Sequence, residues 1–171
     1  MSRVWLITGS SRGLGREIAE AALAAGNQVV ATARDAAALR DLVDTYPDQV
    51  LAASLEVTDR ARADEVVRAA VDAFGRLDVV VNNAGYANIG SIEDFTDHDF
   101  RAQIETNLWG TINVTRAALP IVREQRSGHI IQLSSVGGRD VTAGLGPYQR
   151  AKWAVEGFSR ATSPTSHSVE Q

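Results

Sequence analysis

The sequence predicts an α/β domain built on a doubly wound, parallel β-sheet. Short apolar runs alternate with segments of helical spacing through most of the chain, and a glycine-rich turn follows the first apolar run directly. The chain has 171 residues, of which 44% are hydrophobic and 22% charged, which is enough for one domain with a substantial core. Because parallel strands need a long crossover that a helix can provide, this alternation favours a parallel sheet over a sandwich or a bundle.

The expected strands are five apolar runs, over residues 4–8, 28–33, 50–55, 77–82 and 129–134. Helical spacing lies between them: a first helix ends at Gly26, a short helical stretch covers about 36–46, and another helix ends at Gly75. Thr96 is expected to cap a long helix that Pro120 bends or ends.

The last helix is expected to begin near Tyr148, and residues 163–171 show no apolar periodicity. We therefore expect one domain over 1–162, followed by a disordered tail over 163–171. A doubly wound sheet normally continues with another strand at this point, so the sheet is expected to be incomplete on its C-terminal side.

Composition excludes several classes of partner. Seventeen basic against 21 acidic residues give a net charge of −4, with no basic block that would favour nucleic acid. The apolar runs are too short for a membrane span or a signal peptide. Without cysteine and with three histidines, the chain offers no disulfide, no thiolate and little for a metal, so no metal is expected. We expect a cytoplasmic protein that acts on a small molecule.

The turn "TGSSRGLG" places Gly9, Gly13 and Gly15 between the first strand and the first helix. Such a turn aims backbone N–H groups and the positive helix end at one point, where a pyrophosphate can approach closely. Its spacing departs from G-x-G-x-x-G, so a turn needed only for packing is an alternative. The turn also satisfies the G-x-S-x-G of hydrolases, with Ser11 as nucleophile. That interpretation is disfavoured because the later histidines begin an apolar strand (His129) or lie in the unpatterned tail (His167).

The one lysine of the chain, Lys152, lies four residues after Tyr148, so the two share a helix face. An ordinary surface pair is the alternative. A phenol, with a usual pKa near ~10, becomes an acid–base group near neutrality only when a cation stabilises its anion. Ser135 follows the fifth strand, at the carboxyl edge where a doubly wound sheet binds its ligands. We expect the tyrosine helix to meet that edge.

These motifs together resemble the classical short-chain dehydrogenase/reductase family over about residues 3–160. The resemblance rests, in the family's order, on "TGSSRGLG", "NNAG" over 82–85, Asn107, "LSS" ending at Ser135 and "YQRAK" over 148–152. It implies a Rossmann-like fold in which Tyr148 gives a proton to a carbonyl and Ser135 binds the substrate oxygen. It also implies that Lys152 holds the nicotinamide ribose and favours the tyrosine anion, and that Asn107 positions a water.

The resemblance further implies a nicotinamide nucleotide. The residues expected to contact it are Gly9, Ser11, Arg12, Gly13, Leu14, Gly15, Arg34, Glu56, Val57, Asn83, Ala84, Gly85, Tyr148 and Lys152. Members that prefer NAD carry an acid at the end of the second strand, where this chain has Arg34, and Arg12 adds a second cation. NADP is therefore expected rather than NAD, since a guanidinium binds a 2′-phosphate. Two solvated surface arginines are the alternative.

Family members continue past the tyrosine helix into a further strand and a substrate-covering region, so this chain resembles a truncated member. Two functions follow as hypotheses. The first is NADP-dependent hydride transfer between nicotinamide and a carbonyl or alcohol. The second is a non-catalytic NADP-binding fragment or pseudoenzyme. As in the family, a homodimer or homotetramer is expected.

Overall fold

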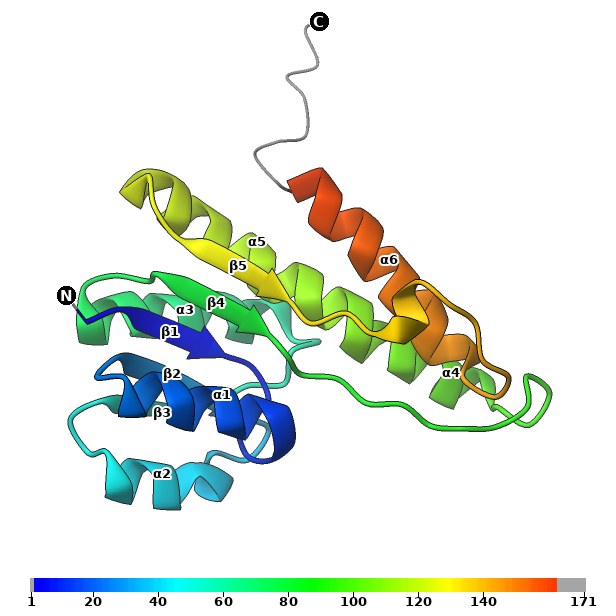
Figure 1. Ribbon diagram of the computed structural model, residues 1–171, viewed down its shortest axis with the longest axis horizontal. Helices are drawn as coiled ribbons and strands as arrows, with labels where there is room; N and C mark the ends of the chain where they lie inside the picture. The colour runs from blue at the N-terminus through cyan, green and yellow to red at the C-terminus, as the bar shows by residue number, and fades with distance from the viewer. Residues whose placement is uncertain (1, 163–171) are drawn as a thin grey trace, which may run out of the picture. The chain divides into compact units, whose positions relative to one another are not determined.

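In the computed structural model, which describes residues 2–162, five parallel strands form one sheet in the order β3-β2-β1-β4-β5 (Figure 1). The strands are β1 (Val4–Ile7), β2 (Gln28–Ala33), β3 (Val50–Ser54), β4 (Val79–Asn82) and β5 (His129–Gln132). Each neighbouring pair is parallel. The order reverses between β1 and β4, because the chain first builds outward through β2 and β3 and then returns to the other side of β1.

Two apolar cores lie on the two faces of this sheet because successive side chains of a strand point in opposite directions. In β1, Val4 and Leu6 pack in the core with α3 and α5, whereas Ile7 packs in the core with α1 and α2. Helices thus cover both faces (Figure 1). The predicted α/β, doubly wound parallel sheet is confirmed.

The helices of this part of the chain begin and end at identifiable signals. They are α1 (Gly13–Ala24), the 3-10 turn η1 (Ala36–Leu39), α2 (Arg40–Thr45), α3 (Arg60–Phe74) and α5 (Gly110–Gln125). The Asp59 carboxylate caps α3 by accepting the Arg62 N–H, and Gly75 ends it. The helix carrying Pro120 does not end there: α5 continues to Gln125.

The chain divides into two compact units. The first joins the chain up to Gly85 to Trp109–Leu133 and contains the sheet; the second joins Tyr86–Leu108 to the chain from Ser134 onward. The elements of the second unit are α4 (Asp97–Ile104), the π-helical turn η2 (Glu105–Trp109) up to Leu108, the 3-10 turn η3 (Val136–Gly138) and α6 (Gly146–Thr162). Thr96 caps α4 as predicted, accepting the Asp99 N–H.

All five predicted strands are present, but several are shorter at the ends. β4, for example, begins at Val79 rather than at residue 77. The preceding Asp78 binds Arg76 and the Val4 N–H with its carboxylate. The last helix begins at Gly146, two residues before Tyr148. The expected tail over 163–171 lies outside the described residues. No described helix is long and apolar enough to cross a membrane.

Candidate active site

The glycine turn of the first unit has the geometry of a phosphate cradle. Gly9 and Gly13 adopt φ angles of +72° and +60°, which glycine accepts at little cost. A Cβ on Gly15 would collide with the Asn83 side chain and the Gly9 carbonyl, whereas a Cβ on Gly13 would meet no atom within 4 Å. The turn is therefore closely packed underneath, at Gly15, and open at Gly13.

The first turn of α1 is free to receive an anion. The residue before the helix, Arg12, makes no side-chain cap, and the first turn contains no acidic residue. Its N–H groups and the positive end of the helix dipole are thus not neutralised by a carboxylate of the helix itself. Leu14, although apolar, is 58% exposed beside this turn. These features fit the pyrophosphate of a dinucleotide.

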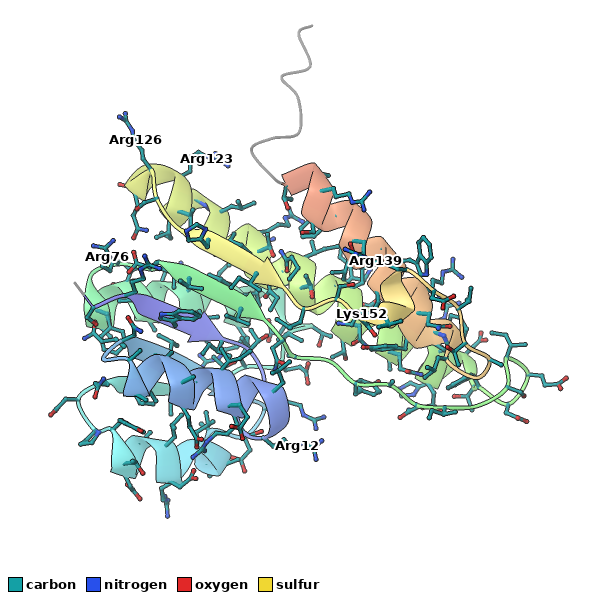
Figure 2. All side chains as sticks on the ribbon, in the orientation of Figure 1. Arg12, Arg76, Arg123, Arg126, Arg139 and Lys152 are labelled. Carbon is teal, nitrogen blue, oxygen red and sulfur yellow. The ribbon has the colours of Figure 1, made fainter. Side chains whose placement is uncertain are left out.

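Arg12 and Arg34, the two cations expected to select the nucleotide, are both exposed. Figure 2 shows the Arg12 side chain at the beginning of α1, pointing away from the helix. Within residues 2–162, no ion pair involves either guanidinium. By contrast, Arg16 is bound to Glu20 and Asp41 at 2.6 and 2.7 Å. The acid next to Arg34, Asp35, uses its carboxylate to cap η1 by accepting the Ala37 N–H.

The segment "NNAG", which begins at the end of β4, is held by the residues that directly follow β1. The Thr8 hydroxyl accepts the N–H groups of Asn83 and Ala84, each at 2.9 Å, and the Asn83 side chain donates to the Thr8 and Gly9 carbonyls. Asn83, Ala84 and Gly85 are thereby held against the glycine turn, as expected of a shared nucleotide site. Thr8 was not predicted as part of it, although its position between strand and turn was a usable signal.

Glu56 and Val57 have different roles in the structure. Glu56 is exposed, and its carboxylate lies 3.5 Å from the Thr58 nitrogen. Val57 is buried, packs against Gly110 and gives its carbonyl to the Asn113 side chain at 3.1 Å. The Val57 carbonyl thus joins the end of β3 to α5, while the Glu56 side chain is the more accessible of the two.

In the second unit, α6 carries Tyr148 and Lys152 on one face. The Lys152 ammonium lies 5.6 Å from the centre of the Tyr148 ring. Lys152 is buried, with 5% of its surface exposed, and burial lowers its pKa from 10.5 to about 8. Figure 2 shows Lys152 on this helix. A buried ammonium beside a phenol supplies the cation that the sequence analysis required.

Ser135 is positioned by the turn that it caps. Its hydroxyl accepts the Gly137 N–H at 3.1 Å at the start of η3. A Cβ on Gly137 would touch Gln149, and one on Gly138 would come within 3.1 Å of the Lys152 carbonyl. The turn that carries Ser135 therefore packs directly against the part of α6 that carries Tyr148 and Lys152.

Asn107 lies fully buried in the π-helical turn η2. Its side-chain nitrogen donates to the carbonyls of Tyr86 and Gln103, both at 2.8 Å. Local widening of a helix into a π turn is frequent at functional sites. All four predicted catalytic residues lie in the second unit, together with Gln103, which the sequence analysis missed.

Among the described residues of the sheet-bearing unit, no histidine lies near Ser11, the nucleophile of the hydrolase alternative. Because all strands are parallel, Ser11 follows the carboxyl end of β1, whereas His129 begins β5 at the opposite edge of the sheet. His98 is exposed and lies beside Asp99 in the second unit, and His167 lies outside the described residues. Across residues 2–162, no group of three or more His, Asp or Glu side chains could hold a metal ion.

Known proteins match nearly the whole chain. The sequence profile of the short chain dehydrogenase family matches residues 3–168. Oxidoreductase BOA17 of Botryotinia fuckeliana is 52% identical over 160 residues, which are 93% of this chain and 58% of that protein. Subunit BbsD of the (2S)-[(R)-hydroxy(phenyl)methyl]succinyl-CoA dehydrogenase of Thauera aromatica is 36% identical over 94% of this chain and 65% of its own.

A solved structure agrees with these relatives. A short-chain dehydrogenase from Streptomyces avermitilis superposes with a TM-score of 0.90 at 46% identity, over 94% of this chain and 59% of that one. The chain thus spans about three fifths of the length of the Botryotinia and Streptomyces proteins. On sequence and on structure, the chain belongs to the short-chain dehydrogenase family of NAD(P)-dependent oxidoreductases.

Proposed function

We propose that the chain is an NADP-dependent oxidoreductase that interconverts a carbonyl compound and its alcohol, with Tyr148 as the proton donor and acceptor. The observation that carries the proposal is the pairing of Tyr148 with the buried ammonium of Lys152 on one face of α6. Burying an ammonium costs free energy unless hydrogen bonds or opposite charge compensate it. At one helical turn from Tyr148, this ammonium can stabilise the phenolate that forms when the tyrosine gives up its proton.

During reduction, the bound dinucleotide supplies a hydride to the carbonyl carbon. Ser135 donates a hydrogen bond to the carbonyl oxygen and holds it, and Tyr148 transfers its phenolic proton to the same oxygen as negative charge develops there. The product is the alcohol. Lys152 stabilises the resulting phenolate until a proton returns from solvent. Asn107 holds the π-helical turn η2 in place through its hydrogen bonds.

The preference for NADP rests on Arg34 and Arg12. A guanidinium fork binds a phosphate through charge-assisted hydrogen bonds, and neither side chain is engaged in an ion pair within residues 2–162. At the end of β2, where an NAD site carries an acid, this chain has Arg34, and the next residue, Asp35, uses one carboxylate oxygen to cap η1. Glu56, Val57 and the "NNAG" segment would contact the rest of the nucleotide.

The relatives' names support the reaction class and leave the substrate open. BbsD bears the name of a dehydrogenase of a secondary alcohol, so a secondary alcohol or its ketone is the class of compound that we propose. We also propose a cytoplasmic homodimer or homotetramer, for which light scattering on the purified chain is the direct measurement.

Turnover by the purified chain tests the proposal. NADPH oxidation is followed at 340 nm with acetophenone and cyclohexanone, two ketones, as carbonyl probes. We predict measurable oxidation that Tyr148→Phe lowers by a factor of ~100 or more, since the general acid is removed. Tyr46→Phe, on the sheet-bearing unit at the end of α2, is the matched control and should keep the wild-type rate.

Two results would count against the proposal. Equal rates in the wild type and in Tyr148→Phe would remove Tyr148 from the mechanism. Tight NADPH binding without turnover on either probe would instead favour the second function, a non-catalytic nucleotide-binding protein. That function is retained because the chain spans only about three fifths of the length of these relatives.

A further inference from the structure

Gln103 on α4 is a fully buried polar side chain to which the proposed mechanism gives no role. Its Oε1 accepts the backbone N–H of Asn88 at 2.9 Å. Asn88 belongs to the irregular segment that precedes α4, so the hydrogen bond joins two stretches of chain fifteen residues apart. The side chain therefore anchors that segment to the helix.

Asn107, one turn further along, binds the same segment. Its Nδ2 donates both to the Tyr86 carbonyl and to the Gln103 carbonyl, each at 2.8 Å. The two residues thus hold Tyr86 and Asn88 from consecutive turns, where the helix widens into η2. With the chain from Tyr86 to Asn88 as its last side, the arrangement is a closed ring that we call the Gln103 ring: Gln103, Asn107, Tyr86 and Asn88.

The ring is connected to the helix of the proposed proton donor. Two residues beyond Asn88, the Gly90 N–H donates to the Gly144 carbonyl at 3.0 Å. Gly144 lies four residues before Tyr148, in the loop that leads into α6. The segment 86–90 is therefore held at one end by the ring and at the other by the loop that precedes the tyrosine.

Packing alone does not explain a glutamine at this position. Within the described part of the chain, Gln103 Nε2 is buried and makes no hydrogen bond, which costs free energy that an apolar side chain of similar volume would not. The acceptor oxygen is the part of the side chain that the structure uses. We propose that Gln103 is a positioning residue that closes the ring and thereby fixes Asn107 and residues 86–88 for the proposed reaction. This proposal rests on the proposed function.

Three variants separate this role from a general effect on folding. Gln103→Met keeps the volume and removes the acceptor. Gln103→Glu keeps an acceptor oxygen and, studied at about pH 5, where burial favours the neutral carboxyl group, should restore the ring. The matched control is Gln125→Met, because Gln125 clamps Leu77 in the same manner, accepting its N–H at 3.0 Å and donating to its carbonyl at 2.8 Å. Gln125 lies at the end of α5, in the unit that bears the sheet.

The experiment measures amide hydrogen exchange by NMR on the full chain, together with NADPH turnover on acetophenone. In Gln103→Met, we predict that the Asn88 amide exchanges at least ~10 times faster, since it loses its acceptor. We also predict that kcat falls by a factor of ~10 or more through displacement of the reacting groups. Gln103→Glu should return Asn88 exchange and kcat to within about threefold of the wild type. Gln125→Met should change neither.

Unchanged exchange of the Asn88 amide in Gln103→Met would overturn the proposal. The proposal would also be overturned if this amide exchanged faster in Gln103→Met while kcat stayed equal to that of Gln125→Met. A wild-type chain without turnover would count against the proposed function instead. The exchange comparison would then decide alone whether Gln103 closes the ring. If Gln103→Met fails to fold, Gln103→Glu still decides the question: faster Asn88 exchange in that folded variant contradicts the acceptor role, and protected exchange supports it.

Discussion

Lys152 combines a cost to the fold with a use in the reaction. Burial holds its pKa at about 8 in the folded chain, against 10.5 ordinarily. Between these two values the unfolded chain binds more protons than the folded chain, so the stability of the wild type rises with pH across that range. Below pH 8 the full penalty of burying the ammonium is present.

Lys152→Met should therefore stabilise the fold while removing turnover. At pH 7 we expect the free energy of unfolding to rise by on the order of 1–3 kcal/mol, because a buried charge is replaced by an apolar side chain. This gain should shrink above pH 8 and disappear near pH 10.5. Urea denaturation at several pH values measures it, with the exposed neighbour Arg150→Met as control. A loss of stability at pH 7 would contradict the argument.

The proposed preference for NADP depends most directly on Arg34. Arg34→Ala removes one charge-assisted contact to a 2′-phosphate, and such a contact contributes about 1.5–3 kcal/mol. Calorimetric titration should therefore show NADPH binding weakened by a factor of ~10–100, with NADH binding changed by less than about threefold.

Arg123→Ala, on the surface of α5, should leave both affinities as they are. If Arg34→Ala weakens NADPH and NADH equally, Arg34 contacts a part common to both nucleotides and the proposed basis of selectivity is wrong.

Among the elements, α5 depends on a close approach at its first residue. A Cβ on Gly110 would collide with the Val57 side chain at the end of β3. A Cβ on Gly157, within α6, would meet no atom within 4 Å. The same substitution should therefore have opposite effects at the two positions.

Gly110→Ala should lower the free energy of unfolding by about 1–3 kcal/mol through overpacking. Gly157→Ala should raise it by about 0.5–1 kcal/mol, because alanine is the better helix former. Thermal and urea denaturation of both variants provide the comparison. A stabilising Gly110→Ala would show that α5 can move away from Val57 at little cost.

The sequence was most informative about elements whose signal is local. Apolar runs and capping residues such as Thr96 and Gly75 are read from a few neighbouring positions, and the strands and the helix ends that they predict are present. The helix predicted over 36–46 instead begins as a 3-10 turn, which the Asp35 side chain caps by accepting the Ala37 N–H.

Features that depend on contacts distant in sequence could not be predicted. Thr8 binds the N–H groups of Asn83 and Ala84 some 75 residues away, and Gln103 reaches Asn88 across a loop. Neither residue type stands out in the sequence, since a threonine after a strand and a glutamine in a helix are ordinary. Tyr148 and Lys152 were found because the i, i+4 relation is local and the lysine is unique in the chain.

For the molecule as a whole, the division into two units corresponds to a division of labour. The glycine turn, Arg12, Arg34 and the "NNAG" segment belong to the unit that bears the sheet, whereas Asn107, Ser135, Tyr148 and Lys152 belong to the other. Under the proposed function, variants of Arg12 and Arg34 should act on nucleotide affinity, and Ser135 and Asn107 variants on turnover. Tyr148 and Lys152 variants should act on turnover and also on affinity, because these residues are expected to contact the nucleotide.

The most direct test of the central claim is a calorimetric titration of the wild-type chain with NADPH and, in parallel, with NADH. We expect NADPH to bind saturably and at least ~10 times more tightly than NADH, because a guanidinium binds the 2′-phosphate. A folded sample that binds neither nucleotide, or that binds NADH as tightly as NADPH, would contradict this expectation.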